Sequence, residues 1–398
     1  MLRSLFSGIS GMRAHQTMLD VTGNNIANVN TTGFKASQTQ FTDTLSQVLN
    51  ATGAPGRGAG GTNPAQVGLG VQVAAVTTNF STGARQTTGR STDMMISGDG
   101  FFVVQKGGQQ AYTRAGSFDF DANGNLVSPD GSFVMGWGAQ NGVVNPNSIL
   151  APLKLPTTTL SGAAATGKIT FDGNLPSDAE AATELTRDVE VYDNLGAART
   201  VTLTFTKVDT PEGDPAQWEV TAKDPKTGAT TTQTLAFDGD GRLTSGGNLN
   251  LGNMDIDLST LTGFADLNTM AVASRDGQAA GVLESFSITA DGTILGAFSN
   301  GRKEEIGRIA LANFDNASGL EKLGGSMYGA SVNSGDPQIG GAGEGGRGDL
   351  VGNALEMSNV DLSQEFTNLI VAQRGFQANS RIITTSDEVL QELVNLKR

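Results

Sequence analysis

The N-terminal stretch from Leu2 to Phe41 reads LRSLFSGISGMRAHQTMLDVTGNNIANVNTTGFKASQTQF. Its apolar residues recur at alternating steps of three and four, with Gln16 and Gly23 filling two gaps, which predicts a helix with a narrow apolar seam. The Asn, Thr and Gly residues between Asn24 and Gly33 predict the end of this helix. The residues of this seam are Leu2, Leu5, Ile9, Met12, Leu19 and Ile26.

A second helix is predicted near the other end of the chain, over residues 358–396. Ser358-Asn-Val-Asp361 fits a capping box, and Asp361 and Glu365 carry negative charge near the positive end of the helix. Apolar residues again follow the three-four rule, which predicts that both helices contribute to one shared contact surface. The residues of this second seam are Leu362, Phe366, Leu369, Phe376, Ile383 and Leu390.

The residues between the helices carry the patterns of β-strands. Phe101–Val104 is a short apolar run typical of a buried strand. Valine, leucine and phenylalanine alternate with polar residues over 189–191 and 201–205, on either side of a turn at Asp193–Gly196, which predicts a hairpin. Asp291-Gly292 and Asn300-Gly301 predict two-residue hairpin turns with positive φ.

Two Gly-rich stretches, Gly53–Gly61 and Gly340–Gly348, lie almost symmetrically in the chain and predict linkers. We therefore predict a multidomain α+β fold, in which the terminal helices pair in a coiled-coil-like manner and the β domains are nested, discontinuous and all-β, as antiparallel barrels or sandwiches. The four predicted parts are a terminal helical domain (residues 1–30 and 355–398), a linker or hinge region (31–70 and 340–354), an inner β domain (71–148 and 282–339) and an outer acidic β domain (149–281).

Composition excludes several classes of function. The 398 residues carry a formal net charge of −14, which argues against a nucleic-acid partner because phosphates require a positive surface. No stretch approaches the roughly 18 apolar residues of a membrane span. The chain has no cysteine, so it has no disulfide, thiolate metal site or cysteine nucleophile. No apolar run follows Arg3, so we expect no cleaved secretory signal.

Three local motifs suggest binding sites, but each has a simpler interpretation. Asp119-x-Asp121-x-Asn123-Gly124 matches a calcium-loop template, although strands flank it and hairpin turns use the same residues. Gly341-x-Gly343-x-x-Gly346 matches a dinucleotide fingerprint, yet no strand precedes it and no helix follows. Arg347-Gly-Asp349 matches an adhesion tripeptide, which is most often a chance match.

The single histidine restricts catalysis further. Any Ser/His machinery would have to use His15, which lies one turn from Met12 and Leu19 on the predicted N-terminal helix. A packing role or a polar role in the seam is favoured at such a position. We therefore expect no catalytic residue, no cofactor and no metal ion, and predict that the protein is not an enzyme.

Several motifs resemble the rod, hook and hook-associated axial proteins of bacterial flagella. They are Ser7–Met12 and Asn24–Lys35 at the front, with Met357–Leu362, Ala372–Asn379 and Thr384–Leu390 at the back. Residues 96–103 and 112–118 resemble the inner β domain of that family. The motif residues singled out by the resemblance are Asn24, Asn25, Asn28, Gly33, Phe34, Gln373, Arg374, Gly375, Phe376 and Asn379.

The length and the acidic insert resemble hook members of the family rather than the shorter distal-rod members. The resemblance implies a structural subunit that polymerises with copies of itself through its terminal helices. The resulting hollow, curved tube would act as a universal joint, passing torque from rod to filament, and as an export channel. The implied partners are the distal rod protein, the hook cap, the hook-filament junction proteins and the flagellar type III export apparatus.

The implied location is the flagellar hook, outside the cell. The alternatives are a distal rod protein and, from another class, a secreted acidic β-rich surface or adhesion protein.

Overall fold

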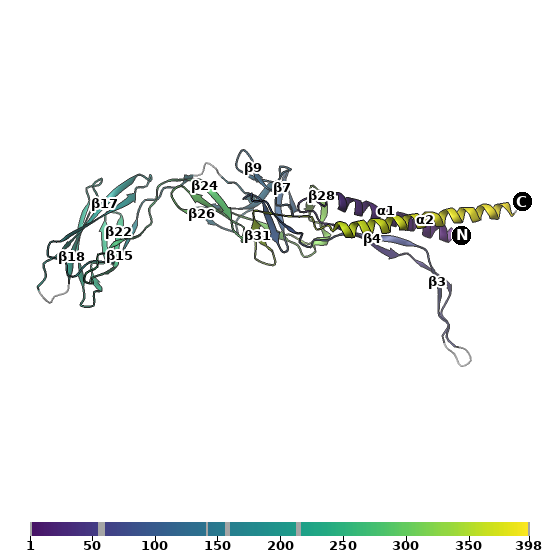
Figure 1. Cartoon of the computed structure of the whole chain (residues 1–398), viewed down its shortest axis with the longest axis horizontal. Coiled ribbons are helices and arrows are strands. Elements are labelled where there is room, and N and C mark those ends of the chain that lie inside the picture. Colours follow the sequence, from purple (N-terminus) through teal and green to yellow (C-terminus); the bar gives the residue numbers. More distant parts are fainter. Residues whose placement is uncertain (1, 55–59, 141, 156–159, 212–215, 397–398) are drawn as a thin grey trace. The chain divides into compact units, whose positions relative to one another are not determined.

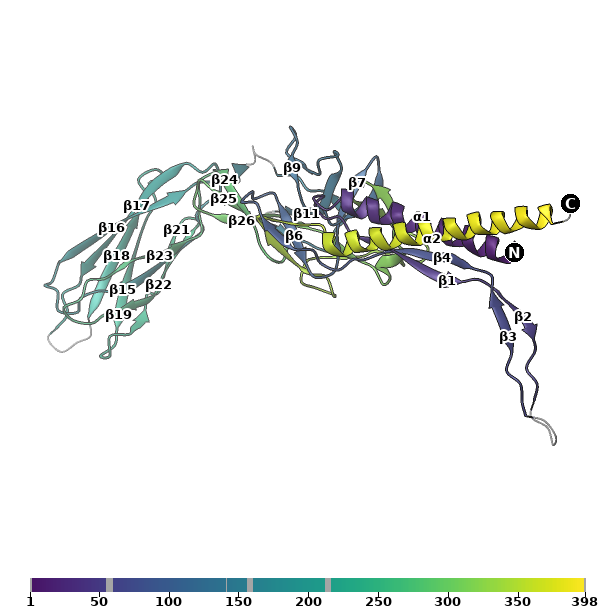
Figure 2. The same cartoon turned by 45° about the vertical axis from the view of Figure 1, so that its right-hand side comes forward.

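The computed structural model describes residues 2–54, 60–140, 142–155, 160–211 and 216–396, and its two long helices lie side by side (Figures 1 and 2). Helix α1 spans Leu2–Ala27 and helix α2 spans Leu362–Asn395. Gly8 approaches Ile383, whereas His15 approaches Gly375, so the two helices run antiparallel. Both predicted helices are therefore present, and the first and last described residues lie at the same end of the pair.

Helix α2 begins later than the sequence suggested. Its N-cap is Asp361, whose carboxylate accepts hydrogen bonds from the backbone N–H groups of Ser363 and Gln364. The prediction of a capping box starting at Ser358 is wrong. The reason is that residues 354–356 form a strand and the Asn359 side chain makes hydrogen bonds to Ala36 and Asn79. The helix therefore begins only beyond these residues.

The chain divides into two compact units. Unit 1 contains Met1–Pro156, Phe286–Leu295 and Glu305–Arg398, and unit 2 contains Thr157–Ser285 and Gly296–Glu304. Strands β24 (Gly281–Ile288), β25 (Thr293–Phe298) and β26 (Lys303–Ile309) carry the chain from one unit into the other.

Unit 1 is built on a sheet in which β26, β11, β7, β8, β29 and β28 are successive neighbours. Phe101, Val103 and Tyr112 of β7 and β8 form its core with Trp137 and Tyr328, which confirms the predicted buried strand. The unit contains these strands and several shorter ones. Their bounds are β5 (Arg85–Thr87), β6 (Met94–Ser97), β7 (Phe101–Lys106), β8 (Gln109–Thr113), β9 (Asp119–Phe120), β10 (Leu126–Val127), β11 (Phe133–Gln140), β12 (Val143–Val144), β13 (Ala151–Pro152), β27 (Leu311–Asn313), β28 (Glu321–Gly324), β29 (Met327–Gly329), β30 (Gln338–Gly340), β31 (Asp349–Gly352) and β32 (Ala354–Glu356), with a 3-10 turn at Ala317–Gly319.

The stretches predicted as linkers contain strands. Strand β1 (Ser37–Asp43) pairs with β4 (Val71–Thr78) beside α1, and β2 (Ser46–Asn50) pairs with β3 (Ala65–Gly68) in a two-stranded ribbon that projects from the helices (Figure 2). Residues 55–59 of the first Gly-rich stretch lie outside the described residues. In the second, β30 and β31 flank a turn, because residues 338–352 are held by pairing with β27 and β6.

Unit 2 is a β-sandwich. One sheet has the order β21-β22-β15-β23, and the other has the order β16-β17-β18-β19-β20. The pair β15–β22 is parallel, an exception to the antiparallel pairing that we predicted. The bounds of the sandwich strands are β15 (Lys168–Asn174), β16 (Glu184–Tyr192), β17 (Ala198–Lys207), β18 (Gln217–Lys223), β19 (Thr230–Phe237), β20 (Leu243–Ser245), β21 (Asn248–Leu251), β22 (Met254–Thr262) and β23 (Ala271–Arg275). Strand β14 (Leu160–Ser161) pairs with β24 and is in neither sandwich sheet.

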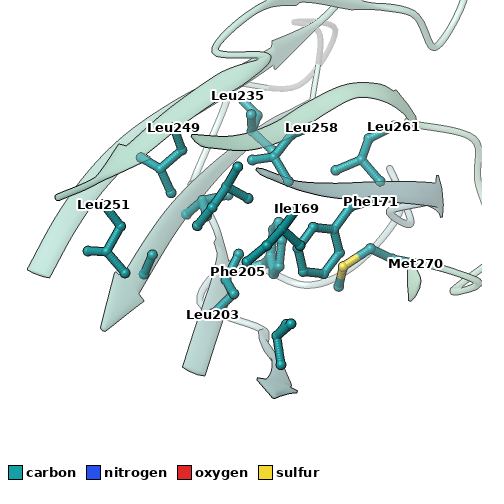
Figure 3. Packing of buried hydrophobic residues seen from close by; sticks show 14 of the residues in the cluster. Ile169, Phe171, Leu203, Phe205, Leu235, Leu249, Leu251, Leu258, Leu261 and Met270 are labelled. Carbon is teal, nitrogen blue, oxygen red and sulfur yellow. The ribbon is translucent and has the colours of Figure 1, made fainter. Parts of the chain in front are cut away.

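Inward-facing side chains from both sheets fill the core of unit 2 (Figure 3). Phe171, Leu203 and Phe205 are fully buried there, since alternate residues of a strand point to the same face. The predicted hairpin is present, with Val189 opposite Val201.

The hairpin turns have three central residues rather than the predicted two. At 289–293 and 298–302 the backbone closes across a three-residue loop, and only Gly292 and Gly301 take positive φ, of 83° and 79°. Such a loop is a type I turn followed by a left-handed residue, so one glycine is sufficient. The turns that begin at Asp121, Asp193 and Asp238 have the same three-residue loop. In each of them the aspartate carboxylate accepts hydrogen bonds from two backbone N–H groups of its own turn.

Two turns of similar sequence, Ser128-Pro-Asp-Gly-Ser132 and Thr289-Ala-Asp-Gly-Thr293, place an aspartate between two hydroxyl donors. Ser128 and Ser132 both donate to Asp130, and Thr289 and Thr293 both donate to Asp291. Partial burial opposes ionisation, but hydrogen bonds, including one from Lys106 to Asp130, outweigh it and lower the pKa of both carboxyl groups.

This pKa depression predicts a specific loss of stability in acid. The two aspartates stabilise the fold above their unfolded-state pKa of about 3.9, and this contribution disappears as the pH falls through their lower folded-state values. A variant with Asp130→Asn and Asp291→Asn should be less stable than the natural chain at pH 7, with a smaller difference near pH 2. Urea unfolding at several pH values measures this. The exposed Asp20→Asn variant serves as control, and parallel pH profiles for all chains would contradict the prediction.

Candidate functional site: the terminal helices and their junction

Small residues bring the two helices close together. A Cβ atom at Gly11 would lie 2.6 Å from Asn379 Oδ1, and one at Gly375 would lie 2.5 Å from the His15 ring. Asn379 Nδ2 donates to the Gly375 carbonyl oxygen at 2.8 Å, which fixes the amide against Gly11. Three motif positions, Gly11, Gly375 and Asn379, therefore have a direct structural role.

The buried side of α1 is lined by small and polar residues rather than by the predicted apolar seam. Gly8, Gly11, Ala14, Thr22 and Asn25 are buried. Of the seam residues, Leu5, Ile9, Met12, Leu19 and Ile26 are half-buried, and the side chain of Leu2 lies outside the described set. On α2, Leu369, Ile383 and Leu390 are half-buried, whereas Leu362, Phe366 and Phe376 are exposed.

His15 packs between the helices and the β1 strand. Its ring meets Phe41 edge-on, with ring centroids 5.8 Å apart, and occupies the space that a Cβ at Gly375 would need. Its Nδ1 is buried and has no hydrogen-bond partner among the described residues. This is the environment of a packing residue.

The asparagine-rich motif fastens the end of α1 to its neighbours. Asn25 Nδ2 donates to the Ser37 carbonyl oxygen at 2.8 Å and to Glu365 Oε1 of α2 at 3.0 Å, and Asn25 Oδ1 accepts from the Ser37 backbone N–H. Asn28 closes the helix end by donating to Asn24. Asn25 therefore links α1, β1 and α2.

Gly33 and Phe34 lie at the point where the chain passes from α1 to the sheet. Gly33 has φ of 67°, and a Cβ there would lie 2.5 Å from the Ala115 backbone nitrogen. Only glycine fits this close approach. The Lys322 ammonium lies 5.5 Å from the centroid of the Phe34 ring and donates to Ser37 Oγ, and burial lowers the pKa of Lys322.

Buried charges hold the same junction together. Lys35 Nζ lies 2.6 Å from Glu356 Oε1, and Arg114 Nη1 lies 3.6 Å from Glu356 Oε2. The three side chains come from the loop after α1, the residue that follows β8 and the strand before α2. Sequence analysis included Arg114 and Asn359 only as parts of longer family motifs, and it did not include Glu356. No local sequence pattern predicts a contact between segments so far apart in the chain.

One side of α2 exposes apolar side chains. Leu362, Phe366, Ile370 and Phe376 have 40%, 52%, 56% and 37% of their surface exposed. A shallow cavity of about 350 Å³ lies against Arg381, Ile382 and Val389. Exposed apolar rows of this kind are typical of association surfaces.

The other sequence motifs have structural roles. Asp121 binds the backbone of its own turn and Asn125. In the Gly-rich stretch Arg347 Nε donates to the Gly341 carbonyl oxygen, and Asp349 begins strand β31. No group of metal-binding side chains is present in the described part of the chain. Neither described helix is both long and apolar enough to cross a membrane.

Four family models match the chain in succession. Residues 5–35 match the flagella basal body rod protein, 95–176 the flagellar hook protein FlgE/F/G D1 domain, 170–292 the flagellar basal body protein FlaE D2 domain, and 351–396 the flagellar basal body rod FlgEFG protein C-terminal. The flagellar hook protein FlgE of Treponema pallidum (strain Nichols) is 39% identical over 100% of both chains. The chain belongs to the flagellar hook and rod protein family. This family consists of structural proteins of the flagellum.

Other relatives bear related names. The flagellar hook protein FlgE of Salmonella typhimurium is 35% identical, covering 99% of this chain and 100% of that one. The flagellar basal-body rod protein FlgG of Bacillus subtilis (strain 168) is also 35% identical, covering 100% of both chains. A crystal structure of Helicobacter pylori flagellar hook protein FlgE2 has the same fold, with a TM-score of 0.55 and 17% identity over 68% of this chain and 100% of that one.

The close helix contact predicts opposite effects for two glycine substitutions. Gly375→Ala places a methyl group in the His15 ring and should destabilise the helix pair by about 1–3 kcal/mol. Gly23→Ala, with nothing within 4 Å of its new Cβ, should leave α1 unchanged or stabilise it by up to about 1 kcal/mol. Hydrogen exchange of the α1 and α2 amides measures both. Equal protection in the two variants would contradict the close contact.

Proposed function

We propose that the chain is a structural subunit of the bacterial flagellar hook, which polymerises through its terminal helices into a hollow, curved tube. Support comes from its full-length similarity to proteins named flagellar hook protein FlgE. In this proposal the tube passes torque from rod to filament as a universal joint and serves as an export channel.

The exposed apolar side of α2 is the observation that carries the proposal. Gly8 and Gly11 of α1 bring the helices into close contact, whereas Phe366 and Ile370 of α2 are 52% and 56% exposed and are available to another copy of the chain. Full burial of one such side chain contributes roughly 1.5–3 kcal/mol. We propose that the two seams, together with these exposed residues, make coiled-coil-like contacts between subunits.

The remaining partners and the location follow from the proposed role. We propose that the polymer meets the distal rod protein at one end and the hook cap or the hook-filament junction proteins at the other. The chain would reach this extracellular site through the flagellar type III export apparatus, without a cleaved signal. It needs no cofactor and catalyses no reaction in this role. The four-part division with an outward acidic domain remains part of the proposal.

Replacing the exposed apolar residues should block assembly without unfolding the chain. Phe366→Ser with Ile370→Ser should raise the concentration needed for polymerisation roughly tenfold or more, because two buried side chains are lost from each contact. Sedimentation and electron microscopy of purified protein measure this. Leu195→Ser, at an apolar position of unit 2 that is 89% exposed, is the control. Polymerisation of the double variant at the control concentration would contradict the proposed surface.

The second candidate is a distal rod subunit, favoured by the full-length similarity to a protein named flagellar basal-body rod protein FlgG. Immunogold electron microscopy with antibody against unit 2 separates the two candidates. We expect label on a short curved segment between the cell body and the filament. Label that appears only after the envelope is opened would identify a rod subunit instead.

A further inference from the structure

A cluster of buried charges lies where both terminal helices join the β-structure of unit 1. The side chains of Lys35 and Glu356 are 0% exposed and that of Arg114 is 1% exposed. Lys35 follows α1 by eight residues, Glu356 precedes α2 by six, and Arg114 comes directly after β8. The cluster therefore joins the two helix-bearing segments to the sheet.

Glu356 is the centre of the cluster. Its Oε1 accepts from Lys35 Nζ at 2.6 Å and from the Gly83 backbone N–H at 2.8 Å, and its Oε2 faces Arg114 Nη1. Lys35 also donates to the Ser81 carbonyl oxygen at 2.7 Å. One carboxylate thus faces two cations.

The neighbouring Asp99 and Tyr328 do not substitute for Glu356 as the counter-ion of Lys35 and Arg114. Asp99 attracts Arg114 more weakly than Glu356 does. Burial raises the pKa of Tyr328 to about 12, so its hydroxyl is neutral at physiological pH. Burial also lowers the pKa of Lys35 and of Arg114, despite the opposing attraction of Glu356. Burial therefore disfavours the charged form of both cations, and the attraction of Glu356 opposes this effect.

Hydrogen bonds of backbone groups near Glu356 also join the segment that follows α1 to the segment that precedes α2. The Gly33 N–H donates to the Glu356 carbonyl oxygen at 2.8 Å, and the Met357 N–H donates to the Ala84 carbonyl oxygen at 2.9 Å. The Ala36 N–H donates to Asn359 Oδ1 at 2.8 Å. If the segment around Glu356 separates from Arg114 and from β5, with which its strand β32 pairs, the residues after α1 lose their attachment at the same time.

We propose that Glu356 is an ionic latch that couples both terminal helices to the sheet, so that loss of its charge releases α1 and α2 together while the core of unit 1 stays folded. Removing one partner of a buried ion pair leaves an uncompensated buried charge, which is strongly destabilising. The core strands β7 and β11 are held mainly by apolar packing of Phe101, Val103 and Trp137, and the Arg114 guanidinium lies 5.3 Å from the centroid of the Phe101 ring. The latch would make the helix pair a separate cooperative part of the molecule.

Hydrogen exchange of the full-length chain tests the latch. In Glu356→Gln, amides of α1 and α2 should exchange faster by a common factor on the order of 100, whereas those of β7 and β11 should change by less than about threefold. Glu388→Gln is the matched control, because Glu388 is an exposed carboxylate of α2. Unchanged helices, or equal acceleration of helices and core, would overturn the proposal.

A double variant tests whether faster helix exchange in Glu356→Gln comes from the lost charge or from lost packing. Glu356→Gln leaves Lys35 and Arg114 without a shared carboxylate, and adding Lys35→Met restores the natural excess of one buried cation. The double variant should therefore show slower helix exchange than Glu356→Gln alone. If its helices exchange faster, the loss comes from packing and hydrogen bonds, and the latch is refuted. This comparison also holds if Glu356→Gln alone folds poorly.

Discussion

The buried contact between Lys35 and Glu356 joins the segment that leaves α1 to the segment that enters α2. Near this contact, the Asn25 side chain donates hydrogen bonds to the Ser37 carbonyl oxygen and to Glu365. The Asn359 side chain accepts a hydrogen bond from the Ala36 N–H and donates one to the Asn79 carbonyl oxygen. The positions of both helices relative to the sheet depend on this set of contacts. Because polar groups removed from water must be paired, the junction accepts few other arrangements.

Different side chains of the helix pair serve the contact within the chain and the proposed contact between subunits. Contact within the chain uses Gly11, Gly375 and Asn379, whose small size or fixed amide allows the helices to approach closely. The large apolar side chains, such as Phe366 and Ile370, are left on the outside. A lone subunit does not need them for its own packing, which fits a protein whose helices complete their burial in a polymer.

Both helices, the buried strand at Phe101–Val104 and the hairpin around Asp193 were predictable from sequence, because their signals are local and periodic. The turn type was missed, because Asp-Gly and Asn-Gly pairs serve two-residue and three-residue loops equally well. The contact side of α1 was missed because glycine and threonine carry no apolar signal. The ion cluster was missed because Lys35, Arg114 and Glu356 become neighbours only through the tertiary fold. The seam residues remain a prediction for the polymer.

Electron cryomicroscopy of the assembled polymer tests the central claim most directly, since it shows what covers the exposed side of α2. This account predicts that Phe366, Ile370 and Phe376 are buried against helices of neighbouring subunits, with the helix pairs forming the inner wall of a hollow tube. A polymer in which these side chains remain in solvent, while copies touch only through unit 2, would contradict it.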